Sequence, residues 1–252
     1  MRGARRAWDW TQPCAAATGG GPSQLQSARL VAAVAELGSL GCHCTMARTD
    51  SWQAAVIAFR VKSGWATAVL LAGPIDAPVV LDAGIVYLSD PKFPDSKQPY
   101  HHGMYVARKE GPQLERLLAS VAAYSQRPLA TLLSKYVAAN YRLSEAALVV
   151  GSDSDPAVIM NPHIRVHAAE GRLFRTVIEQ ALRHSGIPSS TFVERTLLAH
   201  AARVVRRSPG QLREVVARLR PAAAERWRTE EKVATIAAWL LLASPAHRKS
   251  VA

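Results

Sequence analysis

The stretch that decides the fold is EAALVVGSDSDPAVIMNPHIRVHAAEGRLFRTVIEQALRHSG, residues 145–186. Its apolar run at residues 146–150 is short and uninterrupted, which is typical of a central strand buried on both faces. An acidic turn follows at residues 151–155. Asn161 and Pro162 then predict the N-cap and first position of a helix that runs to the end of the stretch. A strand, an acidic turn and a helix in this order indicate an α/β protein.

The predicted helix is amphipathic. Its apolar side chains recur at helical spacing and form the expected buried stripe: Phe174, Val177, Ile178, Ala181 and Leu182. On the opposite face, around Glu179, lie three basic residues: Arg172, Arg175 and Arg183. The helix therefore predicts one face packed on the sheet and one basic face.

Upstream of this stretch, three apolar and β-branched runs predict a three-stranded meander. They are AAVIAFR at 54–60, WATAVLLA at 65–72 and VVLDAGIVYL at 79–88. Residues 89–111 predict a long surface loop. Two helical pieces, 113–124 and 129–139, are expected to be separated by Pro128.

Downstream, residues 190–193 predict one more strand. Helical spacing then recurs at 197–207, 211–219 and 230–242. Strands that alternate with helices in the second half favour a mixed α/β sheet over separate helical and strand domains.

Residues 1–45 differ from the rest, with a GGGP run at 19–22 and all three cysteines. We expect a disordered tail or a mis-called N-terminal extension, with Met46 as an alternative start, and a single domain over residues 46–252. Neither a spanning helix nor a secretory signal is predicted, so we expect a cytoplasmic protein without a membrane partner. The Arg-bearing start leaves an organelle transit peptide as the alternative.

The formal net charge is +12, and residues 161–252 hold 16 Lys and Arg against 7 Asp and Glu. A basic excess of this kind favours a polyanionic partner, most simply DNA or RNA. The alternative is compositional, since 24 Arg against 7 Lys is what GC-rich coding DNA would give. The candidate contact residues are Arg172, Arg175, Arg183, Arg203, Arg206, Arg207 and Arg213.

The order of these elements resembles the ribonuclease H-like superfamily, and within it the RuvC-type Holliday-junction resolvases. The local matches are the first hairpin at 56–71, the helix after the central strand, and the closing helix after Glu230 and Glu231. The resemblance implies phosphodiester hydrolysis by two Mg²⁺ or Mn²⁺ ions held by carboxylates. By position, Asp153, Asp155, Glu230 and Glu231 are the implied catalytic residues.

The first metal ligand of that family falls at or near Arg60, and no acid lies between residues 54 and 73. Asp82 on the third predicted strand is the candidate replacement, which makes Asp82, Asp153 and Glu231 the implied metal ligands. The cation at residue 60 raises the hypothesis of a scaffold that kept nucleic-acid binding and lost hydrolysis.

Each candidate has a simpler interpretation. The acidic turn is also what a solvated turn capping nearby amides looks like, and Glu230 and Glu231 suit a helix N-terminus with Thr229 as N-cap. His101 and His102 in the long loop suit general-base or nucleic-acid-stacking roles, or ordinary exposed loop positions. His163 and His167, one helical turn apart, suit metal chelation, or partly buried or surface positions.

Three functions follow from these alternatives. The first is a nucleic-acid-binding protein that either is a nuclease or has lost nuclease activity, and for which a homodimer is one expected state. The second is a non-catalytic interaction protein of a larger assembly. The third is a helix-turn-helix DNA reader over residues 196–219, with Ser208, Pro209 and Gly210 as its turn.

Overall fold

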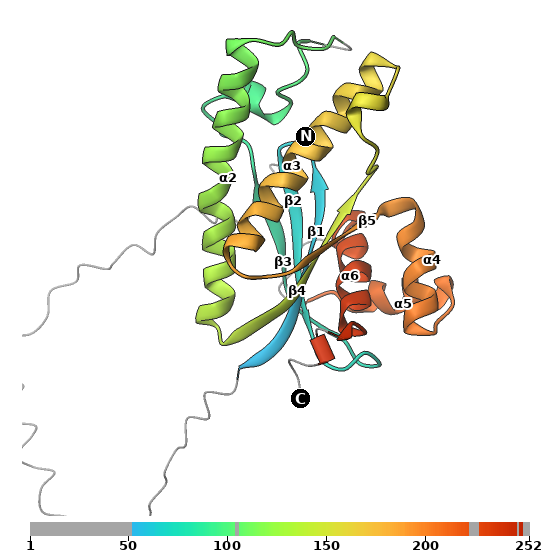
Figure 1. Ribbon diagram of the computed structural model, residues 1–252. Helices are drawn as coiled ribbons and strands as arrows, with labels where there is room; N and C mark the ends of the chain where they lie inside the picture. Colours follow the sequence, from blue (N-terminus) through green and yellow to red (C-terminus); the bar gives the residue numbers. More distant parts are fainter. Residues whose placement is uncertain (1–51, 104–105, 222–226, 246, 249–252) are drawn as a thin grey trace, which may run out of the picture. The chain divides into compact units, whose positions relative to one another are not determined.

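The computed structural model describes residues 52–103, 106–221, 227–245 and 247–248. The predicted tail, residues 1–45, lies outside the described residues. Five strands form one sheet in the order β3-β2-β1-β4-β5, as Figure 1 shows. They are β1 (Gln53–Lys62), β2 (Trp65–Ala72), β3 (Val79–Tyr87), β4 (Tyr141–Val150) and β5 (Ser189–Val193).

The first three strands are an antiparallel meander, and β4 and β5 run parallel to β1 and to each other. This order and these directions are those of the ribonuclease H-like fold, so the fold class predicted from the sequence is confirmed. The β1–β2 turn contains Gly64 at φ +81, where an added Cβ would lie 2.6 Å from the Cγ of Lys97. Glycine therefore suits this tight hairpin.

Alternate residues of β1 enter two separate cores. Ala55, Ile57 and Phe59 face the first helical layer, while Val56 and Ala58 face the second, and all five are fully buried. Because side chains alternate along a strand, this assigns Arg60 to the second face. Burial on both sides explains why β1 and residues 146–150 of β4 read as unbroken apolar runs.

The first helical layer consists of α2 (Pro112–Ala138) and α3 (Pro162–His184). The two predicted pieces around Pro128 are in fact the one continuous helix α2, so that prediction was wrong. A proline inside a helix costs about 3 kcal/mol, because it removes one hydrogen bond and crowds the preceding turn. Burial of Leu129, Leu132 and Tyr136 directly after it offsets this cost.

The predicted ends of α3 are confirmed. The side chain of Asn161 accepts a hydrogen bond from the amide of Ile164 at 3.1 Å, and Pro162 is the first helical residue. Gly186 follows the helix at φ +69. The helix therefore begins and ends where local chemistry directs.

The second helical layer consists of α4 (Glu194–Val205), α5 (Pro209–Arg218) and α6 (Thr229–Leu242). Trp239 of α6 is fully buried, and its indole donates to the carbonyl of Ile75 at 2.7 Å. Residue 228, not the predicted Thr229, is the N-cap of α6. Among the described residues, no helix is both long enough and apolar enough to cross a membrane.

The predicted loop at 89–111 contains a short 3-10 helix, η1 (Pro94–Lys97), and a single β-bridge between His101 and Ala107. A second 3-10 helix, η2 (Pro156–Val158), follows the acidic turn and leads into α3. These two segments bring polar side chains to the N-terminal half of α3.

Candidate functional site

The position where the ribonuclease H-like fold places its first carboxylate is occupied by a buried cation. Arg60 is 5% exposed and forms an ion pair with Glu194, the first residue of α4. The guanidinium also donates to the carbonyls of Val61 at 2.8 Å and Val149 at 3.2 Å. The charge, the hydrogen bonds and the space at this point of the sheet are therefore all taken up by Arg60.

Sequence reasoning missed Glu194. A signal existed, because an arginine within an apolar central strand needs a carboxylate partner. Glu194 was available for this role, because it begins α4, the helix that directly follows the edge strand β5. The pairing spans 134 residues and becomes visible once β5 is placed beside β4.

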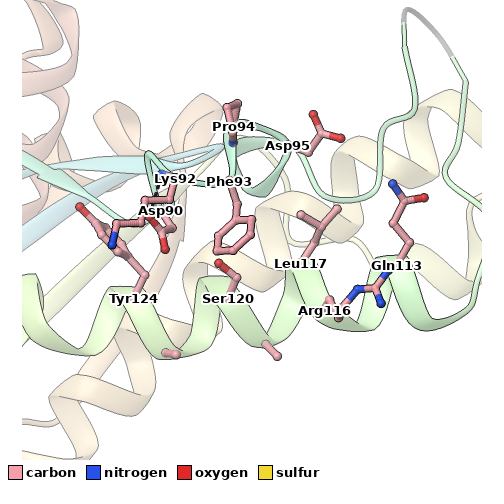
Figure 2. Close-up of a pocket in the computed structure, with 12 residues that line it drawn as sticks. Asp90, Lys92, Phe93, Pro94, Asp95, Gln113, Arg116, Leu117, Ser120 and Tyr124 are labelled. Atoms are coloured by element: carbon pink, nitrogen blue, oxygen red, sulfur yellow. Dashed lines mark hydrogen bonds between the residues drawn. The ribbon is translucent and has the colours of Figure 1, made fainter.

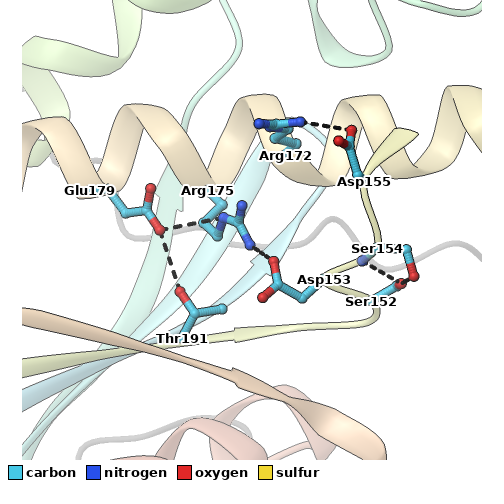
Figure 3. Close-up of polar contacts among 8 residues, drawn as sticks. All are labelled: Ser152, Asp153, Ser154, Asp155, Arg172, Arg175, Glu179 and Thr191. Atoms are coloured by element: carbon cyan, nitrogen blue, oxygen red, sulfur yellow. Dashed lines mark hydrogen bonds and ion pairs between the residues drawn. The ribbon is translucent and has the colours of Figure 1, made fainter. Parts of the chain in front are cut away.

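The acidic turn is closed by arginines of α3, as Figure 3 shows. Asp153 forms an ion pair with Arg175, whose Nε also lies 3.3 Å from Glu179. Glu179 in turn accepts a hydrogen bond from Thr191 of β5 at 3.3 Å. Arg175, predicted as a nucleic-acid contact, is only 17% exposed and is held by these carboxylates.

Asp155 has the role of a cap. Its Oδ1 accepts a hydrogen bond from the amide of Ala157 at 3.1 Å, which makes it the N-cap of η2. The same oxygen lies 3.0 Å from Arg172, and both side chains are more than half exposed (Figure 3). The turn thus has the geometry of a capped, ion-paired connection between β4 and α3.

The carboxylates of α6 occupy its N-terminus. Glu231 accepts from the backbone amide of Arg228 at 2.8 Å, and Glu230 lies 3.9 Å from the ammonium of Lys62. Acidic residues in a first helical turn are favoured by the helix dipole. These contacts account for both residues.

Asp82 faces the other side of the sheet, toward α2. It accepts hydrogen bonds from the hydroxyl of Tyr136 at 2.9 Å and the ammonium of Lys135 at 2.8 Å. Burial, and then the Asp82 carboxylate, raises the pKa of Tyr136 well above its usual value. Asp82 and Glu231 therefore belong to opposite faces of the sheet.

The structure does not bring Asp82, Asp153 and Glu231 together. Within the described part of the chain, the one group of three or more metal-ligating side chains consists of histidines. Two Mg²⁺ or Mn²⁺ ions need oxygen ligands that converge on one point. The residues at this edge of the sheet do not fit such a pair of ions.

Three histidines do converge, at the N-terminal half of α3. His101 from the loop after β3 meets His163 and His167, and one ring nitrogen of each lies within 4.8 Å of the others. His101 Nδ1 lies 2.7 Å from Oε1 of Glu170, which is fully buried. Burial, and then His101 and His163, lowers the pKa of His167, which favours the neutral ring.

The sequence had suggested His163 and His167 as a pair, but not His101 as their third member. Residues 101 and 163 are 62 positions apart, and the loop that carries His101 has no helical or strand periodicity. Their meeting depends on how that loop returns over α3. Tertiary structure is required to see this group.

The remaining predicted contact arginines lie in different environments. Arg207 is half-buried, with its guanidinium 5.7 Å from the centre of the Trp239 ring. Four others are exposed, and no carboxylate of the described residues pairs with them: Arg183 on α3, Arg203 on α4, Arg206 after it and Arg213 on α5. Among them, the last three share the α4–α5 unit.

A groove with a volume of about 840 Å³ lies between α2 and the segment around η1, and Figure 2 shows it. The ring of Phe93 points toward α2, near Leu117 and Ser120. The two acidic residues that line the groove both have partners nearby. Asp90 accepts a hydrogen bond from the amide of Lys92 at 2.9 Å, and Asp95 forms an ion pair with Arg108 at 2.8 Å. This groove is separate from the arginines of α4 and α5.

No protein-family model and no curated protein matches this chain. Among solved structures, it is similar to one described as Thermus thermophilus RuvC, at 9% identity and a TM-score of 0.45, over 75% of this chain and 93% of that one. A second similar structure is described as T. thermophilus RuvC in complex with Holliday junction substrate. It has 9% sequence identity and a TM-score of 0.43, over 77% of this chain and 94% of that one. The chain thus resembles the resolvases expected from the sequence, while strand order and directions identify its fold.

Proposed function

We propose that this protein binds nucleic acid through the arginines of the α4–α5 unit and does not hydrolyse it with a carboxylate-bound metal pair. The observation that carries the binding is the set of exposed cations at Arg203, Arg206 and Arg213. No carboxylate of the described residues neutralises them, in contrast to Arg172 and Arg175. Phosphates are the polyanion that exposed arginines bind best, through bidentate hydrogen bonds.

Arg60 supports the proposed absence of phosphodiester hydrolysis at the end of the central strand β1. A metal pair there would have to displace a buried guanidinium that holds two backbone carbonyls and Glu194. Removing one partner of such a pair leaves an uncompensated charge in the core. The Mg²⁺- or Mn²⁺-dependent nuclease implied by the family resemblance is therefore the less favoured alternative to this proposal.

The test is the salt dependence of binding to labelled four-way junction, duplex and single-stranded DNA and RNA. The triple variant Arg203→Gln, Arg206→Gln, Arg213→Gln should bind more weakly on all bound substrates. Each lost phosphate contact should make the slope of log K against log salt shallower by about 0.9. Fluorescence anisotropy over a range of salt concentrations measures both quantities.

The matched control removes the same charge elsewhere. Arg116, Arg127 and Arg142 are also exposed, on α2 and at the start of β4. Their triple change to Gln should leave the slope nearly unchanged. Equal losses in the two triple variants would mean that total charge, not the α4–α5 unit, governs binding; no binding at low salt would favour the interaction protein.

A helix-turn-helix reader is a second candidate, favoured by the connection between α4 and α5. Residues 206–208 join the helices, with Arg206 in the left-handed conformation at φ 55. Pro209 and Gly210 belong to α5, so the turn predicted at 208–210 was placed too late. In this function α5 would enter the major groove with Gln211 and Arg213, and selection from random duplexes would yield one preferred sequence.

A further inference from the structure

We propose that His101, His163 and His167 form a binding site for Zn²⁺. The geometry of the rings is the first reason. The Nε2 atoms of His163 and His167 lie 3.1 Å apart, one helical turn from each other along α3. A tetrahedral zinc with Zn–N bonds of about 2.0–2.1 Å separates two ligand nitrogens by roughly 3.3 Å. The pair is already close to that spacing.

His101 completes the set from outside the helix. Its ring centre lies 4.7 Å from that of His167 and 5.9 Å from that of His163. With Nδ1 engaged by Glu170, Nε2 is the nitrogen available to a metal ion. Three ring nitrogens from two segments then converge, which one helix alone does not provide.

Glu170 is the second reason. The side chain is fully buried, yet it lies one helical turn beyond His167 and contacts a histidine that is itself only 11% exposed. It also accepts a hydrogen bond from Ser63 in the β1–β2 turn, at 3.4 Å. A carboxylate that receives the second ring N–H of a ligating histidine fixes the ring orientation and strengthens its donor atom. Glu170 has the position of this orienting residue.

The loop that carries His101 is held in place by its own contacts. The amide of His101 donates to Gln98 at 3.1 Å, and Arg108 donates to Pro99 at 2.9 Å and pairs with Asp95. The His101–Ala107 bridge closes the loop. The third ligand is therefore positioned before any ion arrives, which lowers the entropy lost on binding.

The ligand type selects the metal. Neutral imidazoles bind Zn²⁺, Cu²⁺ and Ni²⁺ and are poor ligands for Mg²⁺, which demands oxygen. His167 is exposed, so a fourth position remains open to water or another ligand. Three histidines with the fourth position left to water are a known ligand set for Zn²⁺ in proteins, and this one is separate from the α4–α5 unit.

The experiment must first separate this site from the cysteines. Cys14, Cys42 and Cys44, with His43, lie outside the described residues and bind zinc well in principle. Titrations therefore use the full chain carrying Cys14→Ser, Cys42→Ser and Cys44→Ser. Zn²⁺ is followed by competition with a chromophoric chelator, and Co²⁺ by the visible absorption that reports tetrahedral coordination.

We expect one equivalent of Zn²⁺ in this background. His167→Gln, at an exposed position that tolerates substitution, should weaken binding by roughly 100-fold or more through loss of a ligand. Glu170→Gln should weaken it by about 10–100-fold through loss of orientation. His184→Gln, at an exposed position of the same helix, should leave the affinity unchanged.

Two results would overturn the site. The first is a folded cysteine-free chain, judged by circular dichroism, that binds no zinc. The second is His167→Gln binding as tightly as its parent. Neither outcome depends on nucleic acid, so the zinc site and the proposed function stand or fall separately.

Discussion

Near the end of β1, each face of the sheet holds a buried charged residue, and the two residues have different kinds of partner. On the α4–α6 face, Arg60 is paired with Glu194 and also donates to two backbone carbonyls. On the α2–α3 face, Glu170 is paired with His101, whose second ring nitrogen is not part of this contact. The first arrangement is fixed, whereas the second is adjustable.

This difference teaches where chemistry can remain on the scaffold. A carboxylate paired with a buried arginine has its charge compensated by that arginine. An imidazole held by a carboxylate keeps one nitrogen for another partner. The Arg60–Glu194 pair and the three histidines therefore lie near the same strand end but on different faces.

The largest expected effect is on the fixed pair. Glu194→Gln leaves Arg60 buried without its carboxylate and should lower the free energy of unfolding by about 2–3 kcal/mol, below the full cost because Glu194 is 35% exposed. Adding Arg60→Met should recover part of that loss, because no charge then remains buried. Urea unfolding of the two single variants and the double variant measures the cycle.

The control for this cycle is an exposed pair. Glu214→Gln removes the partner of Arg218, and both side chains are more than 60% exposed. Its cost should be within about 0.5 kcal/mol. A double variant at Arg60 and Glu194 that is less stable than Glu194→Gln would show that Arg60 still stabilises the fold without its carboxylate, which would contradict a buried guanidinium that depends on Glu194.

A smaller effect is expected at Tyr136, on the adjustable face. Tyr136→Phe removes the hydrogen bond to Asp82 and should cost about 1 kcal/mol near neutral pH. Because the folded-state pKa of Tyr136 is raised above 10.0, the unfolded chain loses this proton first as pH rises. The tyrosine's contribution should be complete below pH 10 and decline above it.

Stability measured at neutral pH and above pH 10 checks this sign. The difference between the parent and Tyr136→Phe should shrink at the higher pH. Tyr87→Phe, at a 41% exposed position, serves as the control. A difference that grows with pH would contradict the protonated, buried tyrosine.

Much of the fold was predictable from local pattern. The unbroken apolar runs of β1 and β4 identify strands buried on both faces, and Asn161 with Pro162 locates the start of α3. In both cases the residues that determine the element lie within it or directly next to it in the sequence. Pro128 was misread because a local penalty was outweighed by burial against the distant sheet.

The site was less predictable because its partners are distant in sequence. Arg60 was identified as an anomaly, but its partner Glu194 depends on the placement of β5 and α4. Asp153 and Asp155 looked like ligands because the arginines that pair with them lie on the following helix, where they were interpreted as nucleic-acid contacts. His101 joined His163 and His167 through a loop without periodicity.

The most direct measurement is cleavage of a labelled four-way junction by the full chain with Mn²⁺, at a protein concentration where the junction is fully bound. The account predicts a bound and uncut junction, because Arg60 occupies the carboxylate position and Glu194 is engaged by it. Cleavage that is lost in a folded Asp153→Ala, Glu231→Ala variant would contradict it.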